Sequence, residues 1–223
     1  IGSQITERNP YLEAGNFMSN FIKKLESKSV EIDFVDMGGG FGLSAEGNES
    51  IPSKADFVNS ILEGLNPIDE RYQIIIEPGR SLVGDAGLFL TKVIRRKKNK
   101  DKTFTIVDGA MNDFIRPTLY SAYHKIIPIS KKQGPYGKTD VVGPVCESGD
   151  FFGKDRELPQ NLNEGDLLAI KDAGAYGYEM ASNYNSRPLT AEILVKEDCS
   201  YIIRERQSYR DLLRGEKIPE FLI

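Results

Sequence analysis

The segment VEIDFVDMGGGFG, Val30–Gly42, gives the clearest indication of the fold, because an alternating apolar run leads directly into a glycine cluster. Alternation favours a β-strand, and the glycines favour a tight loop at its carboxyl end. The same order recurs over Tyr72–Arg80, where a short apolar run ends in Glu-Pro-Gly-Arg. Two buried strands that each end in a glycine loop are typical of a β/α fold with a parallel sheet.

Helical patterns precede both strands. Residues 10–28 place apolar side chains at helical spacing, and residues 53–65 predict a second helix with Ser53 as its N-cap. Helix and strand therefore alternate over residues 1–85, which we treat as the first domain.

The pattern changes after residue 85, where strand-like runs follow one another with few helices between them. These runs cover residues 87–95, 103–108, 124–129, 138–145, 166–171, 191–196 and 201–206. We expect residues 86–223 to form a mostly antiparallel β-barrel or sandwich, closed by a short helix over 208–216. The basic run at residues 95–102 lies between two such runs and is interpreted as a solvated hairpin loop.

The composition excludes several classes of function. The 223 residues carry 29 Lys and Arg against 33 Asp and Glu, a net charge of −4, which argues against a nucleic-acid binder. A single histidine and two cysteines 53 positions apart give neither a metal site nor a disulfide framework. No stretch approaches the roughly 20 apolar residues of a membrane span. We expect a soluble protein of the cytoplasm, without a membrane or nucleic-acid partner.

A thiol and a carboxylate stand together at Cys146-Glu147, just after an apolar run broken by Gly-Pro. This pair suits proton transfer, although a lone cysteine is more often a small buried apolar residue. The two glycine loops suit an anion, because backbone N–H groups can approach a phosphate closely there. Glu77 at the end of its strand could hold a cationic ring nitrogen, or it could form a salt bridge with Arg80 or a lysine.

Two further candidates follow strand-like runs. Arg116 and Tyr120 are four residues apart and would share one face if the segment is helical, where the arginine could bind a carboxylate. A surface arginine with a packed tyrosine is the alternative. Tyr176 lies in a run of small residues that would let its ring approach a ligand closely, although tyrosines in such clusters more often serve packing.

Together these motifs resemble the fold-type III family of pyridoxal-phosphate decarboxylases, and within it the diaminopimelate decarboxylases. The resemblance covers nearly the whole chain, in order. It is carried by residues 38–42, 77–80, 111–120, 146–150, 172–176 and 182–188. It implies the C-terminal half of a (β/α)8 barrel followed by a β domain, and a homodimer with shared active sites.

The resemblance also implies residue roles. Pyridoxal 5'-phosphate would be bound by seven residues, with Glu77 on the pyridine nitrogen and the glycines on the phosphate: Ser3, Gly39, Gly40, Glu77, Gly79, Arg80 and Tyr176. The amino-acid substrate would be bound by Arg80, Arg116, Tyr120 and Glu147. Cys146 would be the general acid that protonates the carbon left after loss of carbon dioxide, reaching into the partner's site.

The implied reaction is conversion of meso-2,6-diaminopimelate to L-lysine and carbon dioxide, the last step of lysine biosynthesis. The family's Schiff-base lysine and ring-stacking histidine have no matching motif here, so we expect a fragment or part of a longer enzyme, inactive by itself. The alternatives are a related ornithine, arginine or carboxynorspermidine decarboxylase, and a non-catalytic regulatory homologue.

Overall fold

The computed structural model describes residues 1–44, 50–66 and 72–222. The chain divides into two compact units. The first unit comprises Ile1–Leu88 with Ile170–Tyr176, and the second comprises Phe89–Ala169 with Gly177–Ile223.

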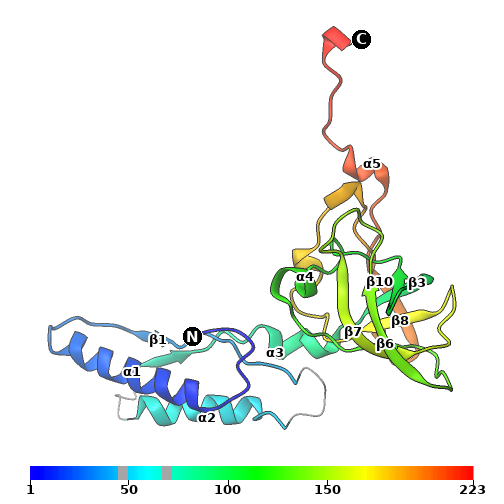
Figure 1. The fold of residues 1–223 in the computed structure, drawn as a ribbon. Helices are drawn as coiled ribbons and strands as arrows, with labels where there is room; N and C mark the ends of the chain where they lie inside the picture. The colour runs from blue at the N-terminus through cyan, green and yellow to red at the C-terminus, as the bar shows by residue number, and fades with distance from the viewer. Residues whose placement is uncertain (45–49, 67–71, 223) are drawn as a thin grey trace. The chain divides into compact units, whose positions relative to one another are not determined.

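The first unit contains two long helices that lie side by side, α1 (Asn9–Glu26) and α2 (Lys54–Leu65) (Figure 1). Strands β1 (Phe34–Asp36) and β2 (Gln73–Ile75) pair in parallel. The short helix α3 (Arg80–Val83) follows. Both predicted helices and the parallel strand pair are confirmed, although each strand is only three residues long.

An aromatic cluster forms the centre of the first unit. Tyr11 on α1, Phe57 on α2 and Phe41 after the glycine loop have ring centres 5.1–5.3 Å apart. All three are almost completely buried, and burial raises the pKa of Tyr11 to about 12. The Tyr11 hydroxyl lies 3.4 Å from the carbonyl oxygen of Gly39. This core therefore supports the glycine loop directly.

Helix α2 begins at the predicted N-cap. The Ser53 hydroxyl accepts the N–H of Asp56 at 3.1 Å, and the Asp56 carboxylate accepts the N–H of Ser53 at 2.9 Å. This reciprocal pair is a capping box, which satisfies N–H groups that the first helical turn leaves without partners.

The second unit is built on a six-stranded mixed sheet with the order β5-β8-β3-β4-β6-β7. Its strands are β3 (Phe89–Asn99), β4 (Lys102–Val107), β5 (Ile126–Pro128), β6 (Tyr136–Val142), β7 (Phe151–Pro159) and β8 (Leu167–Ile170). Strand β4 pairs antiparallel with β3 and parallel with β6, and β6 pairs antiparallel with β7. The predicted β domain is therefore confirmed, although β4 and β6 pair in parallel.

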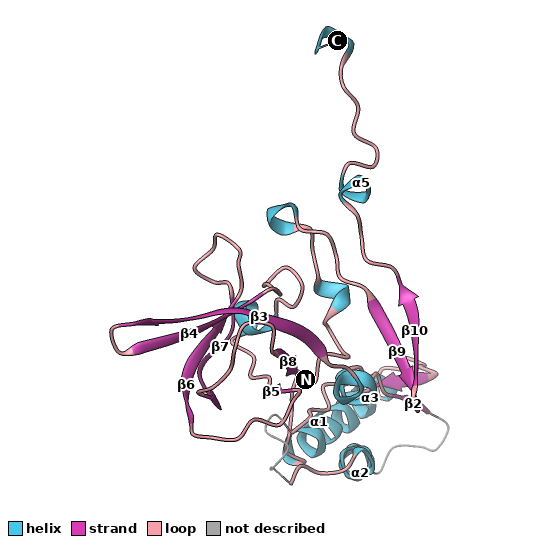
Figure 2. Ribbon diagram, turned by 90° about the vertical axis from the view of Figure 1, so that its right-hand side faces the viewer, coloured by secondary structure: helices cyan, strands magenta, loops and turns pink. Residues whose placement is uncertain are grey.

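A separate antiparallel hairpin joins β9 (Glu192–Lys196) and β10 (Cys199–Arg204), as Figure 2 shows. The other helical elements are short: α4 (Arg116–Tyr120), α5 (Tyr209–Leu212) and 3-10 turns at Gly84–Ala86, Tyr178–Met180, Tyr184–Ser186 and Glu220–Leu222. No helix among the described residues is long and apolar enough to cross a membrane.

Two sequence expectations need correction. The basic run at residues 95–102 is mostly paired strand, because β3 continues to Asn99 and only Lys100-Asp101 forms the turn. Strand β7 was not predicted at all. Its buried residues Phe152 and Leu158 are separated by Lys154, Asp155 and Arg156, and Asp155 has a positive φ of 52°. A register shift at this point breaks the alternation that identifies a strand.

Candidate functional site

The two glycine loops of the first unit lie directly against each other. The Glu77 N–H donates to the carbonyl oxygen of Gly38 at 2.8 Å. A Cβ on Gly39 would lie 2.0 Å from the Glu77 carbonyl oxygen, and one on Gly40 would lie 2.4 Å from the Gly2 carbonyl oxygen. Only glycine fits at these two positions, because backbone of neighbouring segments fills the space that a Cβ would take.

Arg80 links three segments of the first unit. Its Nη2 donates to the Ser3 hydroxyl at 3.1 Å, and its guanidinium carbon lies 5.1 Å from the centre of the Tyr176 ring. A Cβ on Gly79 would lie 2.8 Å from the Tyr176 hydroxyl oxygen. The structure thus brings Ser3, Gly79, Arg80 and Tyr176 together. Within the described residues Arg80 forms no ion pair with Glu77, so the salt-bridge alternative for these two is wrong.

One donor of this cluster has no partner. Arg80 Nε is buried and forms no hydrogen bond within the described part of the chain. Burial also lowers the pKa of Arg80 from its ordinary value. A buried guanidinium N–H without a partner costs free energy, and an anion would satisfy it. Beside the glycine loops, whose N–H groups no side chain of their own can cover, the Arg80 guanidinium fits the phosphate group of a cofactor.

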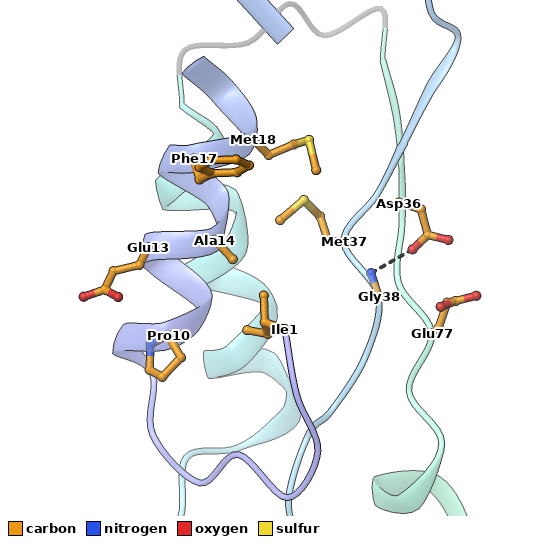
Figure 3. Close-up of a pocket in the computed structure, with 10 residues that line it drawn as sticks. All are labelled: Ile1, Pro10, Glu13, Ala14, Phe17, Met18, Asp36, Met37, Gly38 and Glu77. Atoms are coloured by element: carbon orange, nitrogen blue, oxygen red, sulfur yellow. Dashed lines mark hydrogen bonds between the residues drawn. The ribbon is translucent and has the colours of Figure 1, made fainter. Parts of the chain in front are cut away.

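A mainly apolar cleft of about 720 Å³ lies beside α1 in the same unit. Figure 3 shows the side chains of Met18 and Met37 in the space between α1 and the segment that carries Asp36 and Gly38. Gly38 and Glu77 line this cleft, but Arg80 and Tyr176 do not. The cluster around the Arg80 guanidinium, and not this cleft, therefore has the chemistry of an anion site.

Three of the four predicted substrate residues, Arg116, Tyr120 and Glu147, lie in the second unit, whereas Arg80 lies in the first. Arg116 and Tyr120 are the first and last residues of α4, and the guanidinium carbon lies 5.4 Å from the tyrosine ring centre. The predicted shared face is therefore confirmed. Thr118 on the same helix donates from its hydroxyl to the carbonyl oxygen of Gly149. This bond attaches α4 to the loop that carries Cys146.

Cys146 is exposed on that loop, so the alternative of a buried apolar cysteine is wrong. Its neighbour Glu147 accepts the N–H of Gly149 at 3.1 Å and the Ser148 hydroxyl at 3.3 Å. These bonds, with the Gly149 N–H first, lower the pKa of Glu147. Glu147 is therefore held as a carboxylate, the form that binds an ammonium group.

Sequence reasoning assigned no role to three charged residues of this unit, the half-buried Arg187 and the buried Asp113 and Asp150. Arg187 donates to the Asp108 carbonyl at 2.7 Å and lies 3.5 Å from Asp113. Asp113 and Asp150 are both buried, and burial raises the pKa of each. The signal in the sequence was the set of carboxylates inside otherwise apolar or glycine-rich segments.

Metal ligation finds no support in the part of the chain that the structure describes. No group of three or more histidine, cysteine, aspartate or glutamate residues is placed there to hold a metal ion.

Comparison with known proteins shows to which family the chain belongs. Residues 18–174 match the sequence profile of the pyridoxal-dependent decarboxylases, C-terminal sheet domain. The chain belongs to this family, whose cofactor is pyridoxal phosphate.

Comparison with individual relatives identifies more narrowly which members of this family the chain resembles. The chain is 42% identical to the diaminopimelate decarboxylase of Campylobacter jejuni over 97% of its own length and 53% of the relative's. The crystal structure of diaminopimelate decarboxylase from M. jannaschii matches with a TM-score of 0.93 at 38% identity, over 100% of this chain and 52% of that one. The Helicobacter pylori enzyme complexed with L-lysine matches with a TM-score of 0.86 at 43% identity, over 96% and 52%. The chain thus spans about half the length of these relatives.

Proposed function

We propose that this chain supplies the carboxyl-terminal part of an enzyme that decarboxylates meso-2,6-diaminopimelate to L-lysine and carbon dioxide. The observation that carries the proposal is the cluster of Ser3, Gly79 and Tyr176 around the unpartnered N–H of Arg80, in a chain of a pyridoxal-dependent family. The substrate is inferred from relatives of about 42% identity that are diaminopimelate decarboxylases.

Residues of the first unit would hold the cofactor. The phosphate would bind to the Gly39-Gly40 backbone, Gly79, Ser3 and Arg80, and the ring would lie beside Tyr176. Glu77 would keep a proton on the pyridine nitrogen. When bound, pyridoxal phosphate supplies an electron sink for the electron pair that the departing carbon dioxide leaves behind.

Residues of the second unit would bind the distal end of the substrate and protonate the product. Arg116 and Tyr120, with Arg80, would bind the distal carboxylate and amine end, and Glu147 would bind the distal ammonium. Cys146 Sγ would donate a proton to the carbon that has lost carbon dioxide. A site with these paired charges would reject analogues that lack the distal amino-acid group, because its own polar groups would be left unpaired.

The remaining parts of the proposal concern assembly and location. Residues 1–85 would belong to a (β/α)8 barrel, with residues 86–223 as the β domain. The enzyme would be a cytoplasmic homodimer in which Cys146 acts in the partner's active site.

A substrate comparison tests the function. The full-length protein, loaded with pyridoxal phosphate, would be assayed for carbon dioxide release from meso-diaminopimelate, ornithine, arginine and carboxynorspermidine. We expect the largest kcat/KM with meso-diaminopimelate. Faster turnover of ornithine would contradict the substrate assignment, and no release from any of the four would favour a regulatory homologue.

A further inference from the structure

Asp150 is the buried centre of the loop that carries Cys146. It is 5% exposed, and each of its carboxylate oxygens accepts one backbone N–H. Oδ2 accepts from Val145 at 2.7 Å, and Oδ1 accepts from Met111 at 2.7 Å. The backbone of Asp150 adds a bond from its own N–H to the Glu147 carbonyl at 3.1 Å. One side chain therefore joins two segments that are about 40 residues apart in the sequence.

The bond to Val145 fixes the residue immediately before Cys146. Glu147 N–H donates to the Val145 carbonyl oxygen at 2.8 Å, so Cys146 is the central residue of a three-residue turn. Asp150 holds the N–H at the start of this turn. The backbone on both sides of Cys146 is thereby fixed, although the thiol itself is exposed.

The local sequence makes room for this carboxylate. A Cβ on Gly143 would lie 2.4 Å from Asp150 Oδ2 and 2.5 Å from Oδ1. Real side chains never approach so closely, so glycine at position 143 and aspartate at position 150 form a matched pair. The Gly143 N–H also donates to the Asp150 carbonyl at 3.1 Å, which closes the loop at its base.

The bond to Met111 connects the loop to a second buried network. Asp113 accepts the N–H of Ala110 at 2.9 Å, and Asn112 donates to the Ser182 carbonyl at 3.3 Å. The segment at residues 110–113 is thus held on both sides. It provides a fixed point against which Asp150 can hold the Cys146 turn.

We propose that Asp150 is a positioning residue for Cys146, acting through the N–H groups of Val145 and Met111. The proposal rests on the proposed function in one respect, since Cys146 must be the proton donor for its position to affect turnover. A general acid contributes only when it is held within hydrogen-bond reach of the atom it protonates.

A double-mutant cycle in the full-length, cofactor-loaded protein tests this role. Asp150→Asn keeps the shape but replaces one acceptor with an amide NH2, which would face one of the two backbone N–H groups. We expect Asp150→Asn to lower kcat for meso-diaminopimelate by about tenfold or more, and by less than about twofold in a Cys146→Ala background. Equal losses in the two backgrounds would overturn the proposal.

Asp140→Asn is the matched control. Asp140 is 4% exposed in the same unit and accepts the Asp155 N–H at 2.9 Å, but within the described residues it forms no hydrogen bond with the Cys146 loop. We expect it to leave kcat within about twofold of the parent, whatever its effect on thermal stability. A loss as large as that of Asp150→Asn would show a general effect of a disturbed β domain, and would overturn the proposal.

A second readout does not need decarboxylation. Iodoacetamide would alkylate Cys146 and Cys199, both of which are exposed, and Cys199 serves as the reference thiol in the same molecule. We expect the ratio of the two rates to change by about fivefold or more in Asp150→Asn, and to stay unchanged in Asp140→Asn.

This readout separates the two proposals. If the parent protein decarboxylates none of the substrates, the proposed function fails and the alkylation ratio alone decides whether Asp150 positions Cys146. An unchanged ratio would overturn the positioning role even in an active enzyme. If Asp150→Asn does not fold, Gly143→Ala replaces it, because the added Cβ would displace the same carboxylate, and the same change in the ratio is expected.

Discussion

The guanidinium of Arg80 lies over the ring of Tyr176, with 5.1 Å between the guanidinium carbon and the ring centre. The same group donates to the Ser3 hydroxyl at 3.1 Å while its Nε has no partner among the described residues. Ring and hydroxyl fix the direction of the guanidinium, so one N–H is available for a ligand.

Replacing Arg80 is expected to weaken cofactor binding. Arg80→Lys keeps the charge but loses the planar fork, and we expect the Kd for pyridoxal phosphate to rise by about tenfold or more in the full-length protein. Fluorescence titration of the apoprotein would measure it. Arg95→Ala, an exposed arginine of β3, is the control and should leave the Kd unchanged. Equal affinities of Arg80→Lys and the parent would remove Arg80 from the phosphate site.

Adjacent glycines of the first loop are expected to differ in their tolerance of alanine. Gly39→Ala would place a Cβ 2.0 Å from the Glu77 carbonyl oxygen, whereas a Cβ on Gly38 would meet nothing within 4 Å. Gly38 has a φ of +68°, so alanine there costs about 1 kcal/mol of backbone strain. We expect Gly39→Ala to cost more, up to about 3 kcal/mol. Urea unfolding of both variants would show it, and a larger loss for Gly38→Ala would contradict the account.

The capping box of α2 is expected to make stability depend on pH. The Ser53 hydroxyl, followed by the Ser53 N–H, lowers the pKa of Asp56. A carboxyl whose pKa is lowered by folding stabilises the folded protein fully at pH values above its pKa in the unfolded chain, about 3.9. This stabilisation is lost as the pH falls through the lowered pKa of the folded state. Asp56→Asn should therefore destabilise at pH 7 and much less at the acid end of the folded range.

Thermal unfolding of the parent and Asp56→Asn across this pH range is the measurement. Glu63→Gln on the exposed side of the same helix is the control, and it should change little at any pH. A difference between Asp56→Asn and the parent that stays constant down to pH 3 would show that ionised Asp56 does not stabilise the cap.

Glu147 is expected to set the preference for a substrate with a distal ammonium. Loss of one charge-assisted hydrogen bond costs roughly 1.5–3 kcal/mol, so Glu147→Gln should lower kcat/KM for meso-diaminopimelate by about 10- to 100-fold. Steady-state kinetics would measure it, with Glu157→Gln on the exposed side of β7 as control. An unchanged kcat/KM would mean that Glu147 does not contact the substrate.

The sequence predicted those elements whose patterns are local. The helices at residues 9–26 and 54–65 carry apolar side chains at helical spacing, and Ser53 marks the start of the second. Strand β7 was missed because the positive φ of Asp155 and the register shift beside it interrupt the alternation. The basic residues of β3 were assigned to a loop because charge suggests solvent, although a strand at the end of a hairpin can be equally solvated.

The candidate site was also predictable only in part, because only some of its residues belong to a local sequence pattern. Cys146, Glu147 and the glycine loops stand out as short motifs. The role of Asp150 depends on the N–H of Met111, which is 39 positions away in the sequence, and on the space above Gly143. No local pattern contains that information, since the fold alone brings the two segments together.

In the proposed reaction, Cys146 protonates the product carbon of a diaminopimelate decarboxylase. The most direct test is the kcat of full-length Cys146→Ala and Cys199→Ala with meso-diaminopimelate, each loaded with pyridoxal phosphate. We predict a loss of about 100-fold or more for Cys146→Ala with the cofactor still bound, and no change for Cys199→Ala. A Cys146→Ala enzyme that turns over meso-diaminopimelate at the parent rate would contradict the account.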